Sequence, residues 1–411
     1  MIKKILTAVA ILFTTLIVLA IVAFFYITKQ QKKLSEGELI FNQGKTTVIP
    51  FYYASSGHIL IDVNVEGSEE KYPFILDSGA ANFIFKRHSG EFDLESNGKG
   101  IGIGSTGNFF FSNIKKVDSI KIGELTFKNL NFKEMDFGFN CSENVYGLIG
   151  NGTMKHLNWQ IDFENQKIIV SKKLEDLTIG NNKVEIPIRI NKTSFHAYAS
   201  IQFSKNKGSK RVIVDLGSSG TLSLKEKEYR KDSLSFKEKK IFGRSSEGLG
   251  GQNKNADTEK IVLADSIFFK KTDFSIGNFP VKVSPTALNL LGLGFFKKYK
   301  TTISWSDKKL ILEPYDSIQS FIYKSRGFGM KYKTKEQKLI VKSVTENSPA
   351  SKLNIPVNAE IIELNGKPVN GEKDLCDYYN LETSPDTLKI KIKHNNIVKE
   401  FGVTKEKLFD E

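Results

Sequence analysis

The chain is poor in the two residue types that most often build metal centres. Its 411 residues include five histidines and two cysteines, Cys141 and Cys376. The cysteines are far apart in sequence, and the dispersed histidines form no His-Glu-x-x-His pattern. These absences exclude a disulfide framework and the common metal motifs. We therefore expect no metal and no other cofactor, and any chemistry has to use other side chains.

The positive charge is large but not concentrated. A formal net charge of +14 by itself favours binding to a nucleic acid or to an anionic membrane surface. Basic and acidic residues are interleaved, however, as in KEKEYRKD at 225–232. Such mixtures are typical of a solvated surface, so the sequence predicts no nucleic-acid partner.

One long apolar run stands near the N-terminus. Residues 5–28 carry no charge, with Lys3 and Lys4 before them and Lys29 directly after them. A helix of this length crosses the hydrocarbon layer of about 30 Å. A cleavable signal peptide has a shorter apolar region and a small-x-small site, which is missing here. We expect an uncleaved membrane anchor within 1–35, and lysines on both sides leave its orientation open.

Four segments form two similar pairs: 74–85 with 212–224, and 147–170 with 289–312. The acids of the first pair, Asp77 and Asp215, are 138 positions apart, and the second pair is displaced by 142 positions. Two distant landmarks with nearly the same displacement predict a duplicated unit that spans 45–176 and 183–316. Both units contain short β-branched or alternating runs separated by Gly, Asn and Ser, which predicts a mostly-β fold.

A different pattern begins near residue 322. Ser348 precedes Pro349 in the manner of a helix cap followed by the first helical residue. Asn365-Gly366 is the strongest short hairpin signal, and alternating runs lie around it. The sequence therefore predicts a third, compact domain at 322–408.

The repeated Asp-x-Gly tripeptide is the main chemical feature. A single copy is most often a turn, but here each acid follows three apolar residues, and two apolar residues precede a glycine at 148–150 and again at 290–292. Two such units facing each other about a pseudo-twofold axis would bring Asp77 and Asp215 together. Adjacent carboxylates share a proton, so one can deprotonate a water while the other donates to a carbonyl oxygen.

With these residues the chain resembles an aspartic protease of the retropepsin/pepsin type, with both lobes in one polypeptide and a PDZ domain appended. It is similar to membrane-anchored, PDZ-containing aspartyl proteases of Bacteroidota-type bacteria. The resemblance covers about 45–408, and Asp77-Ser78-Gly79 with Leu148-Ile149-Gly150 matches the family pattern in full. It implies two duplicated acid-protease β-barrel lobes, 45–176 and 183–316, and a PDZ domain at 322–408.

The resemblance also implies a function. Asp77 and Asp215 would form the catalytic dyad of an endopeptidase that acts on a polypeptide, on the extracytoplasmic side of the membrane. Because both lobes lie in one chain, a monomer is sufficient for the active site. By resemblance, four residues support the dyad: Ser78, Gly79, Gly217 and Ser218. The Ser218 hydroxyl would bond the outer oxygen of Asp215.

One position departs from the family pattern. Leu216 stands where the family has a hydroxyl residue that bonds the backbone of the opposite lobe. One lost hydrogen bond costs about 0.5–1.5 kcal/mol, whereas a site loosened by about 1 Å loses about 100-fold in rate. The alternative is therefore a weak or inactive pseudo-protease, a membrane-tethered peptide-binding or scaffold protein.

A glycine-rich segment at 98–111 follows the first motif. Its Gly102-x-Gly104-x-x-Gly107 matches a dinucleotide-binding fingerprint, but the strand and helix that such a site needs are not expected around it. We expect a mobile hairpin over the cleft, where retropepsin-like enzymes carry their flap, with 248–251 as its counterpart. An ordinary glycine-rich turn is the alternative. The expected flap residues are Gly100, Ile101, Gly102, Ile103 and Gly104.

The third domain carries a second candidate site. The residues that resemble the PDZ carboxylate-binding loop are Gly327, Phe328, Gly329 and Met330. Their backbone N–H groups would hold a peptide C-terminus while the peptide adds a strand. Asn354 and Asn358 stand where related domains usually have glycine. The alternative role is a packing module that steadies the lobes.

Overall fold

The computed structural model describes seven stretches of the chain: 2–41, 45–136, 144–232, 235–315, 326–335, 338–369 and 386–409. Strands hold 49% of the residues and helices 15%, which confirms the predicted mostly-β class. Both cysteines lie outside the described residues.

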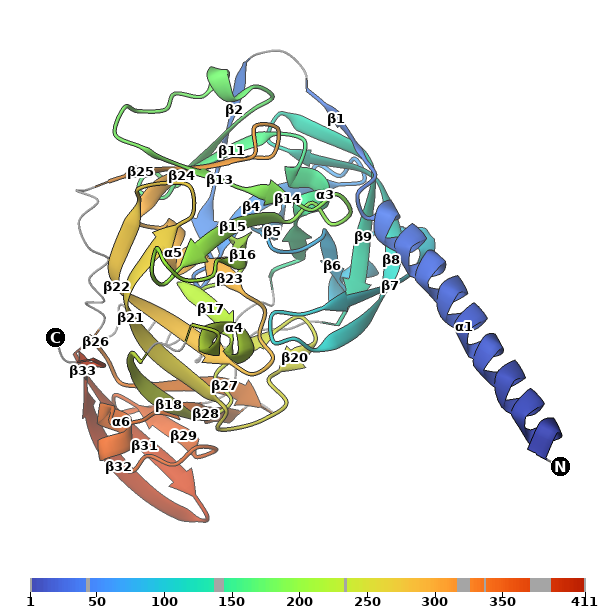
Figure 1. Ribbon diagram of the computed structural model, residues 1–411. Coiled ribbons are helices and arrows are strands. Elements are labelled where there is room, and N and C mark those ends of the chain that lie inside the picture. Colours follow the sequence, from blue (N-terminus) through green and yellow to red (C-terminus); the bar gives the residue numbers. More distant parts are fainter. Residues whose placement is uncertain are drawn as a thin grey trace.

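Helix α1 (Ile2–Lys33) projects from the β-body, and its apolar side chains are exposed (Figure 1). Its last turn rests on β7 (Ser96–Ile103), where the Gln31 side chain donates to the carbonyl of Ile101 at 2.7 Å. By length and composition α1 is able to cross a bilayer. A signal sequence has the same properties, so the uncleaved anchor stays a prediction.

The first unit is built on one sheet with the strand order β1-β9-β6-β10-β5-β4-β8-β7, to which β3 is added beside β4. Along β4, Ile61 and Val63 are fully buried while Asp62 between them is half-buried, as expected for a sheet with one face on the core. The remaining elements of this unit are β1 (Glu38–Ile40), β3 (Tyr52–Tyr53), β4 (Ile59–Val65), β5 (Tyr72–Leu76), β6 (Phe83–Phe85), α2 (Lys86–Ser89), β8 (Phe109–Ile122), β9 (Leu125–Met135), β10 (Gly147–Ile149) and α3 (Asn151–Met154).

A six-stranded sheet joins the two units in the order β13-β25-β24-β11-β12-β2. At its centre the antiparallel pair β11–β24 sets Gln160 opposite Thr302, two positions that the 142-residue displacement makes equivalent. Equivalent positions can face each other in an antiparallel pair only about a local twofold axis. The strands of this six-stranded sheet are β2 (Thr46–Pro50), β11 (Asn158–Asp162), β12 (Lys167–Ser171), β13 (Val184–Pro187), β24 (Tyr299–Ser304) and β25 (Lys309–Pro314). The short helix η1 (Leu174–Asp176) lies between β12 and β13 in the sequence.

The second unit contributes to a third sheet, which continues into the C-terminal residues in the order β14-β15-β16-β23-β17-β22-β21-β18-β28-β29-β31-β32. Its elements are β14 (Arg189–Ile190), β15 (Ala197–Gln202), β16 (Lys210–Asp215), β17 (Leu222–Lys225), α4 (Glu226–Arg230), β18 (Lys237–Gly243), β21 (Glu259–Phe269), β22 (Ser275–Ser284), β23 (Leu290–Gly292) and α5 (Leu293–Phe296). A separate pair is formed by β19 (Glu247–Gly248) and β20 (Gly251–Gln252).

One strand arrangement occurs in both units. In the first, β10 runs parallel to β5 and antiparallel to β6; in the second, β23 runs parallel to β16 and antiparallel to β17. The pair Leu76–Ile149 in the first unit corresponds to Val214–Leu291 in the second, in the same register. The described strands therefore repeat around both acids, while the identity of the two units as protease lobes stays a prediction.

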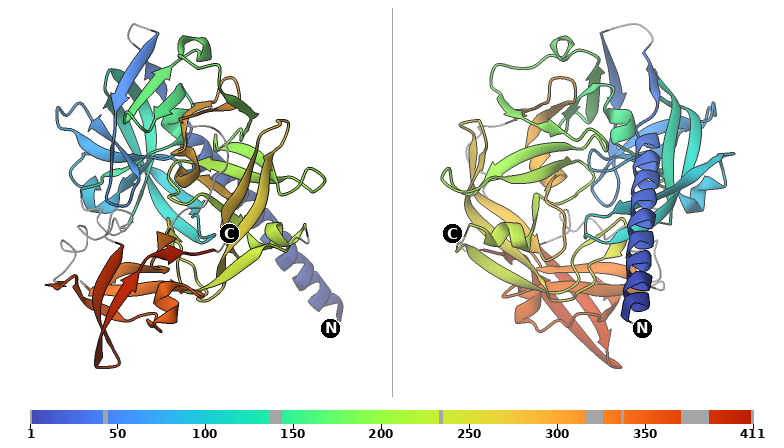
Figure 2. Two further views of the ribbon diagram at one scale, coloured as in Figure 1. Left: turned by 90° about the vertical axis from the view of Figure 1, so that its left-hand side faces the viewer. Right: turned by 45° about the vertical axis from the view of Figure 1, so that its right-hand side comes forward.

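The C-terminal residues form a smaller body with its own apolar core, at one end of the second unit (Figure 2). It joins that unit through β18 and β28, which pair over Ile241–Thr345, Phe242–Val344 and Gly243–Ser343. Its elements are β26 (Arg326–Gly327), β27 (Met330–Lys335), β28 (Lys338–Thr345), α6 (Pro349–Lys352), β29 (Glu360–Leu364), β30 (Lys367–Pro368), β31 (Thr387–His394), β32 (Ile397–Thr404) and β33 (Glu406–Lys407).

Candidate active site

The two acids lie at corresponding strand ends. Asp77 directly follows β5, and its N–H donates to the carbonyl of Ile149 at 2.9 Å. Asp215 is the last residue of β16 and lies beside Gly292 of β23. Their exposed fractions are 8% and 7%. Both carboxylates are thus held at the edge of the apolar core by a rigid strand.

The structure brings the two carboxyl groups into hydrogen-bond contact. Each lies over the glycine of the opposite turn: a Cβ on Gly79 would lie 2.3 Å from the carboxyl carbon of Asp215, and a Cβ on Gly217 would lie 2.2 Å from that of Asp77. Real Cβ atoms do not approach so closely, so both positions need glycine for space rather than for backbone flexibility.

Burial raises the pKa of both carboxyl groups, and the charge of Asp77 raises the pKa of Asp215 further, well above its usual range. Hydrogen bonds work in the opposite direction: the Gly79 N–H donates to Asp77 at 2.8 Å and the Gly217 N–H to Asp215 at 2.9 Å. Two coupled acids of this kind release their protons in separate steps, so there is a range of pH in which the pair holds a single proton.

Only one of the two turns supplies a hydroxyl brace to the other. The Ser78 hydroxyl donates to the carbonyl of Val214 at 2.8 Å and accepts from the N–H of Leu216 at 3.0 Å. The equivalent side chain, Leu216, is fully buried in the apolar core. The sequence predicted that half of this bracing would be missing. In the structure Ser78 braces the opposite turn and Leu216 does not.

The role implied for Ser218 is not what the structure contains. Within the described part of the chain its hydroxyl makes no hydrogen bond to Asp215; its backbone N–H holds that carboxylate instead. The hydroxyl lies against Gly292, 3.0 Å from where a Cβ would stand. The turn after Asp215 directs the Ser218 side chain toward β23. The hydroxyl contact with Asp215 that the resemblance implied is therefore missing, which corrects the sequence-based expectation.

Two histidines that the sequence analysis left without a role lie beside the acids. The Nε2 of His58 is 3.0 Å from the carbonyl oxygen of Gly217, and the Nε2 of His196 is 2.8 Å from that of Gly79. Both contacts cross from one unit to the other. The signal was present in the sequence, because Ser-x-His occurs 19 residues before each Asp.

The segment predicted as a flap is the hairpin of β7 and β8. Ile101 pairs with Phe111 and Ile103 with Phe109, while Gly102 lies under the ring of Phe110. The five expected flap residues, Gly100 to Gly104, thus form the last part of β7 and the start of its turn. The segment is therefore a hairpin in the structure, and its role as a flap stays a prediction.

The tip of this hairpin meets β19 and β20. The Thr106 hydroxyl donates to the carbonyl of Gly251 at 3.1 Å, and the Asn108 amide donates to the carbonyl of Gln252 at 2.7 Å. A Cβ on Gly104 would overlap the carbonyl oxygen of Leu249. The two glycine-rich segments predicted as counterparts are therefore in direct contact.

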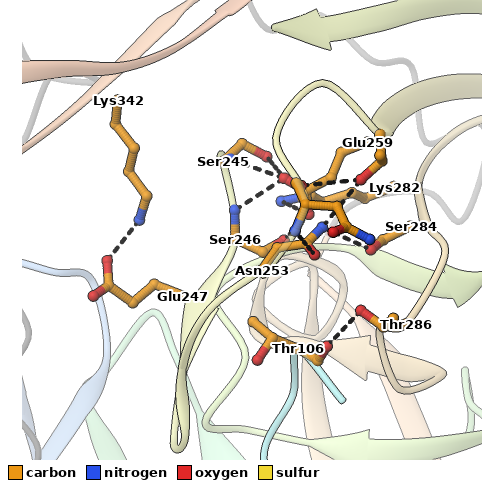
Figure 3. Close-up of polar contacts among 12 residues, drawn as sticks. Thr106, Ser245, Ser246, Glu247, Asn253, Glu259, Lys282, Ser284, Thr286 and Lys342 are labelled. Carbon is orange, nitrogen blue, oxygen red and sulfur yellow. Dashed lines mark hydrogen bonds and ion pairs between the residues drawn. The ribbon is translucent and has the colours of Figure 1, made fainter. Parts of the chain in front are cut away.

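A buried carboxylate holds the base of the β19–β20 hairpin (Figure 3). Glu259 accepts from the Ser245 hydroxyl at 2.8 Å and pairs with Lys282 at 3.5 Å. These partners lower the pKa of Glu259 to about 2, although burial opposes them, and burial lowers the pKa of Lys282 to about 7. The hairpin is then tied to the C-terminal domain by Glu247, which pairs with Lys342 at 2.7 Å.

The predicted carboxylate-binding loop follows β26. Phe328 and Met330 are buried in the C-terminal core, and the carbonyl of Phe328 accepts from the N–H of Ala350 at 3.0 Å. Gly329 has φ +71°, and a Cβ there would overlap Ser348, so glycine is required. Residues 370–385, which in sequence follow β30, lie outside the described part, so only one side of a peptide groove is described.

Asn354 and Asn358 have φ values of +54° and +67°, the left-handed region in which asparagine is the usual substitute for glycine. This explains why they stand where related domains have glycine.

Comparison with known families assigns the C-terminal domain. Residues 327–404 match the PDZ domain family. No curated protein was found to match the chain. The chain thus carries a PDZ domain at 327–404, and this domain supports recognition of a peptide or substrate.

Proposed function

We propose that the chain is an aspartic endopeptidase that hydrolyses peptide bonds with a water activated by Asp77 and Asp215. The observation that carries the proposal is the reciprocal packing of the two Asp-x-Gly turns, in which each glycine lies under the opposite carboxylate. This packing buries two acids in contact with each other, which costs stability, and perturbed acids of this kind are concentrated at functional sites.

In the proposed reaction the ionised carboxylate takes a proton from a water as the water oxygen attacks the carbonyl carbon of the substrate. The protonated carboxyl group donates to the carbonyl oxygen, which gives a neutral tetrahedral intermediate. The proton taken from water then passes to the leaving nitrogen as the C–N bond breaks, and one hydroxyl of the intermediate returns its proton to the other carboxylate as the C=O bond re-forms. Because the acids are coupled, the two roles belong to the pair and not to fixed residues.

The substrate in this proposal is an extended polypeptide that lies beneath the β7–β8 hairpin. The PDZ domain would hold a peptide C-terminus or another part of the substrate. Anchoring through α1 would place both domains at a membrane, with the extracytoplasmic side as the expected location. One chain supplies both acids, so the proposed site needs no second copy.

A second candidate function is supported by Leu216. Since the second turn lacks a hydroxyl brace, the cleft could bind peptides without cutting them, as a membrane-tethered pseudo-protease. The retained pair of acids opposes this candidate, and we place it second.

Cleavage of a peptide library from pH 3 to 8 by the full chain in lipid nanodiscs tests the proposal, beside Asp77→Asn and Asp215→Asn with folding checked by circular dichroism. We expect cleavage by the wild type and its loss in both variants. A folded wild type that cuts nothing would contradict the proposal. Gain of cleavage in Leu216→Thr would then identify the second turn as the cause, and continued inactivity would favour the peptide-binding protein.

A further inference from the structure

His58 and His196 occupy equivalent places in the two units. They are 138 positions apart, the same displacement that separates the two acids. His58 directly precedes β4, and His196 directly precedes β15. Each of these strands pairs with the strand that ends at an acid, in the same register. The local twofold arrangement therefore extends to both histidines.

The hydrogen-bond partners determine the tautomer of each ring. A carbonyl oxygen can only accept, so the Nε2 that faces Gly217 or Gly79 has to carry the proton. The Nδ1 atom of each ring then accepts a hydrogen bond from a serine hydroxyl 2.7 Å away. The serine is Ser56 for His58 and Ser194 for His196. Each serine thus holds its imidazole as a neutral donor aimed at the opposite unit.

The surroundings keep both rings uncharged. Burial, with Lys297 nearby, lowers the pKa of His58 to about 4, although its bond to Gly217 opposes the change. Burial also lowers the pKa of His196, and Lys133 contributes. Above about pH 5 the His58 ring is therefore a neutral donor of fixed orientation rather than a titrating charge.

Further contacts fix the histidine loops to the opposite unit. Lys297 donates to the carbonyl of Gly57 at 3.1 Å and lies 4.2 Å from the ring centre of Tyr53. Its equivalent, Lys155, lies 4.4 Å from the ring centre of Phe195. The loop that carries each histidine is therefore contacted by a lysine of the unit to which the histidine bonds.

The two accepting carbonyls belong to the residues that hold the acids. Gly79 donates its N–H to Asp77 and has its Cα beneath the Asp215 carboxylate, so a shift of Gly79 moves both acids. Gly217 stands in the reciprocal position, since its N–H donates to Asp215 and its Cα lies beneath Asp77. A bond to either carbonyl therefore sets the separation of the two carboxyl groups.

We propose that His58 and His196 are positioning residues of the Asp pair: each braces the acid-bearing turn of the opposite unit and together they replace the hydroxyl brace that Leu216 cannot make. The proposal gives them no part in proton transfer. The kinetic consequence rests on the proposed peptidase function, whereas the effect on the protonation of the pair does not.

The first test compares His58→Leu and His196→Leu with His58→Gln and His196→Gln in the full chain. Leucine removes the donor, whereas the glutamine amide nitrogen reaches nearly the place of Nε2 and can donate to the same carbonyl. We expect kcat to fall by up to about 100-fold in the leucine variants, with KM little changed, because misplacement by about 1 Å has this effect. The glutamine variants retain most of the activity.

His156→Leu is the matched control, since His156 is a half-buried histidine of the first unit whose Nε2 has no hydrogen-bond partner among the described residues. It should leave kcat unchanged. Equal losses for leucine and glutamine, or a change confined to KM, would overturn the proposal. Should the leucine variants not fold, Ser56→Ala and Ser194→Ala free the ring to change tautomer and should lower kcat in the same direction by a smaller factor.

A second readout does not need turnover. The infrared C=O band of the protonated acid, identified as the band that Asp77→Asn removes, is followed from pH 3 to 8. We expect His58→Leu and His196→Leu to shift its midpoint and the glutamine variants to restore it. If the wild type cuts nothing but the leucine variants show this shift, the proposed peptidase function is rejected and the bracing role of the histidines is kept. Folded leucine variants with an unchanged midpoint would reject the braces.

Discussion

The turn that carries Asp77 and the turn that carries Asp215 are alike in most contacts and differ in one. Both place a glycine under the opposite carboxylate, and both offer that glycine's carbonyl to a histidine of the other unit. They differ at the middle residue, where Ser78 braces the opposite turn and Leu216 enters the core. The two repeated glycines have no steric alternative. The middle residue differs, and in our proposal the histidine bonds supply the bracing that Leu216 cannot give.

The two hairpins show a similar contrast. The β7–β8 hairpin is long and belongs to the sheet of the first unit, whereas β19 and β20 have two residues each and, within the described ranges, pair only with one another. The shorter hairpin takes its support from outside, through Glu259 and Lys282 at its base and Lys342 of the PDZ domain. Short strands without neighbours are marginal by themselves, so the contact with the PDZ domain adds to the support of this hairpin.

The largest effect is expected when the shared feature is broken. Gly79→Ala or Gly217→Ala puts a Cβ within about 2.5 Å of the opposite carboxyl group and forces the acids apart. We expect cleavage to fall at least about 100-fold, with about 1–3 kcal/mol lost from the free energy of unfolding. Initial rates and urea unfolding measure both. Gly220→Ala, whose Cβ would meet nothing within 4 Å, is the control and should be near neutral.

Removing the one hydroxyl brace should be the next largest change. Ser78→Ala leaves the buried carbonyl of Val214 and N–H of Leu216 without their partner, which costs about 1–3 kcal/mol of unfolding free energy. The rate should fall together with the stability. Ser218→Ala provides the comparison, because its hydroxyl does not contact Asp215 in the structure. Equal losses in the two variants would contradict the one-sided brace.

The pH dependence of stability separates histidines from acids. The pKa of His58 is lowered from 6.5 to about 4 on folding, so between these values the unfolded chain binds the proton and acid destabilises the fold. The raised pKa values of Asp77 and Asp215 act in the opposite sense, since their contribution is lost as the pH rises through the folded-state values. Urea unfolding at pH 4 to 7 should show a smaller loss towards acid in His58→Gln than in the wild type. An unchanged slope would contradict this assignment.

The smallest effect is expected at the contact between the short hairpin and the PDZ domain. Lys342→Met removes the partner of Glu247, and a partly exposed pair of this kind contributes about 0.2–1 kcal/mol. A double-mutant cycle with Glu247→Gln should return a coupling within this range and a loss of cleavage of a few-fold. Lys352→Met, which breaks the more exposed pair with Glu406, should change neither value.

Local patterns predicted much of the fold. Alternating apolar residues predicted the mostly-β class, the Asn365-Gly366 turn predicted a hairpin that forms, and the C-terminal patterns predicted a compact domain, which the family resemblance identified as a PDZ domain. These features depend on neighbouring residues, which is why the sequence reveals them. The union of the PDZ strands with β18 was not predicted, because strand pairing between domains leaves no local pattern.

At the candidate site the sequence determined which residues are present twice: an acid after an apolar strand, a glycine two positions later, and a Ser-x-His before them. Only the tertiary structure decided what each copy contacts. The histidine bonds join residues 159 and 117 positions apart, and Ser218 bonds Asp215 through its backbone N–H where the resemblance assigned the hydroxyl. Side-chain identity is local information, whereas the partner of a side chain depends on how two units meet about an axis that neither contains alone.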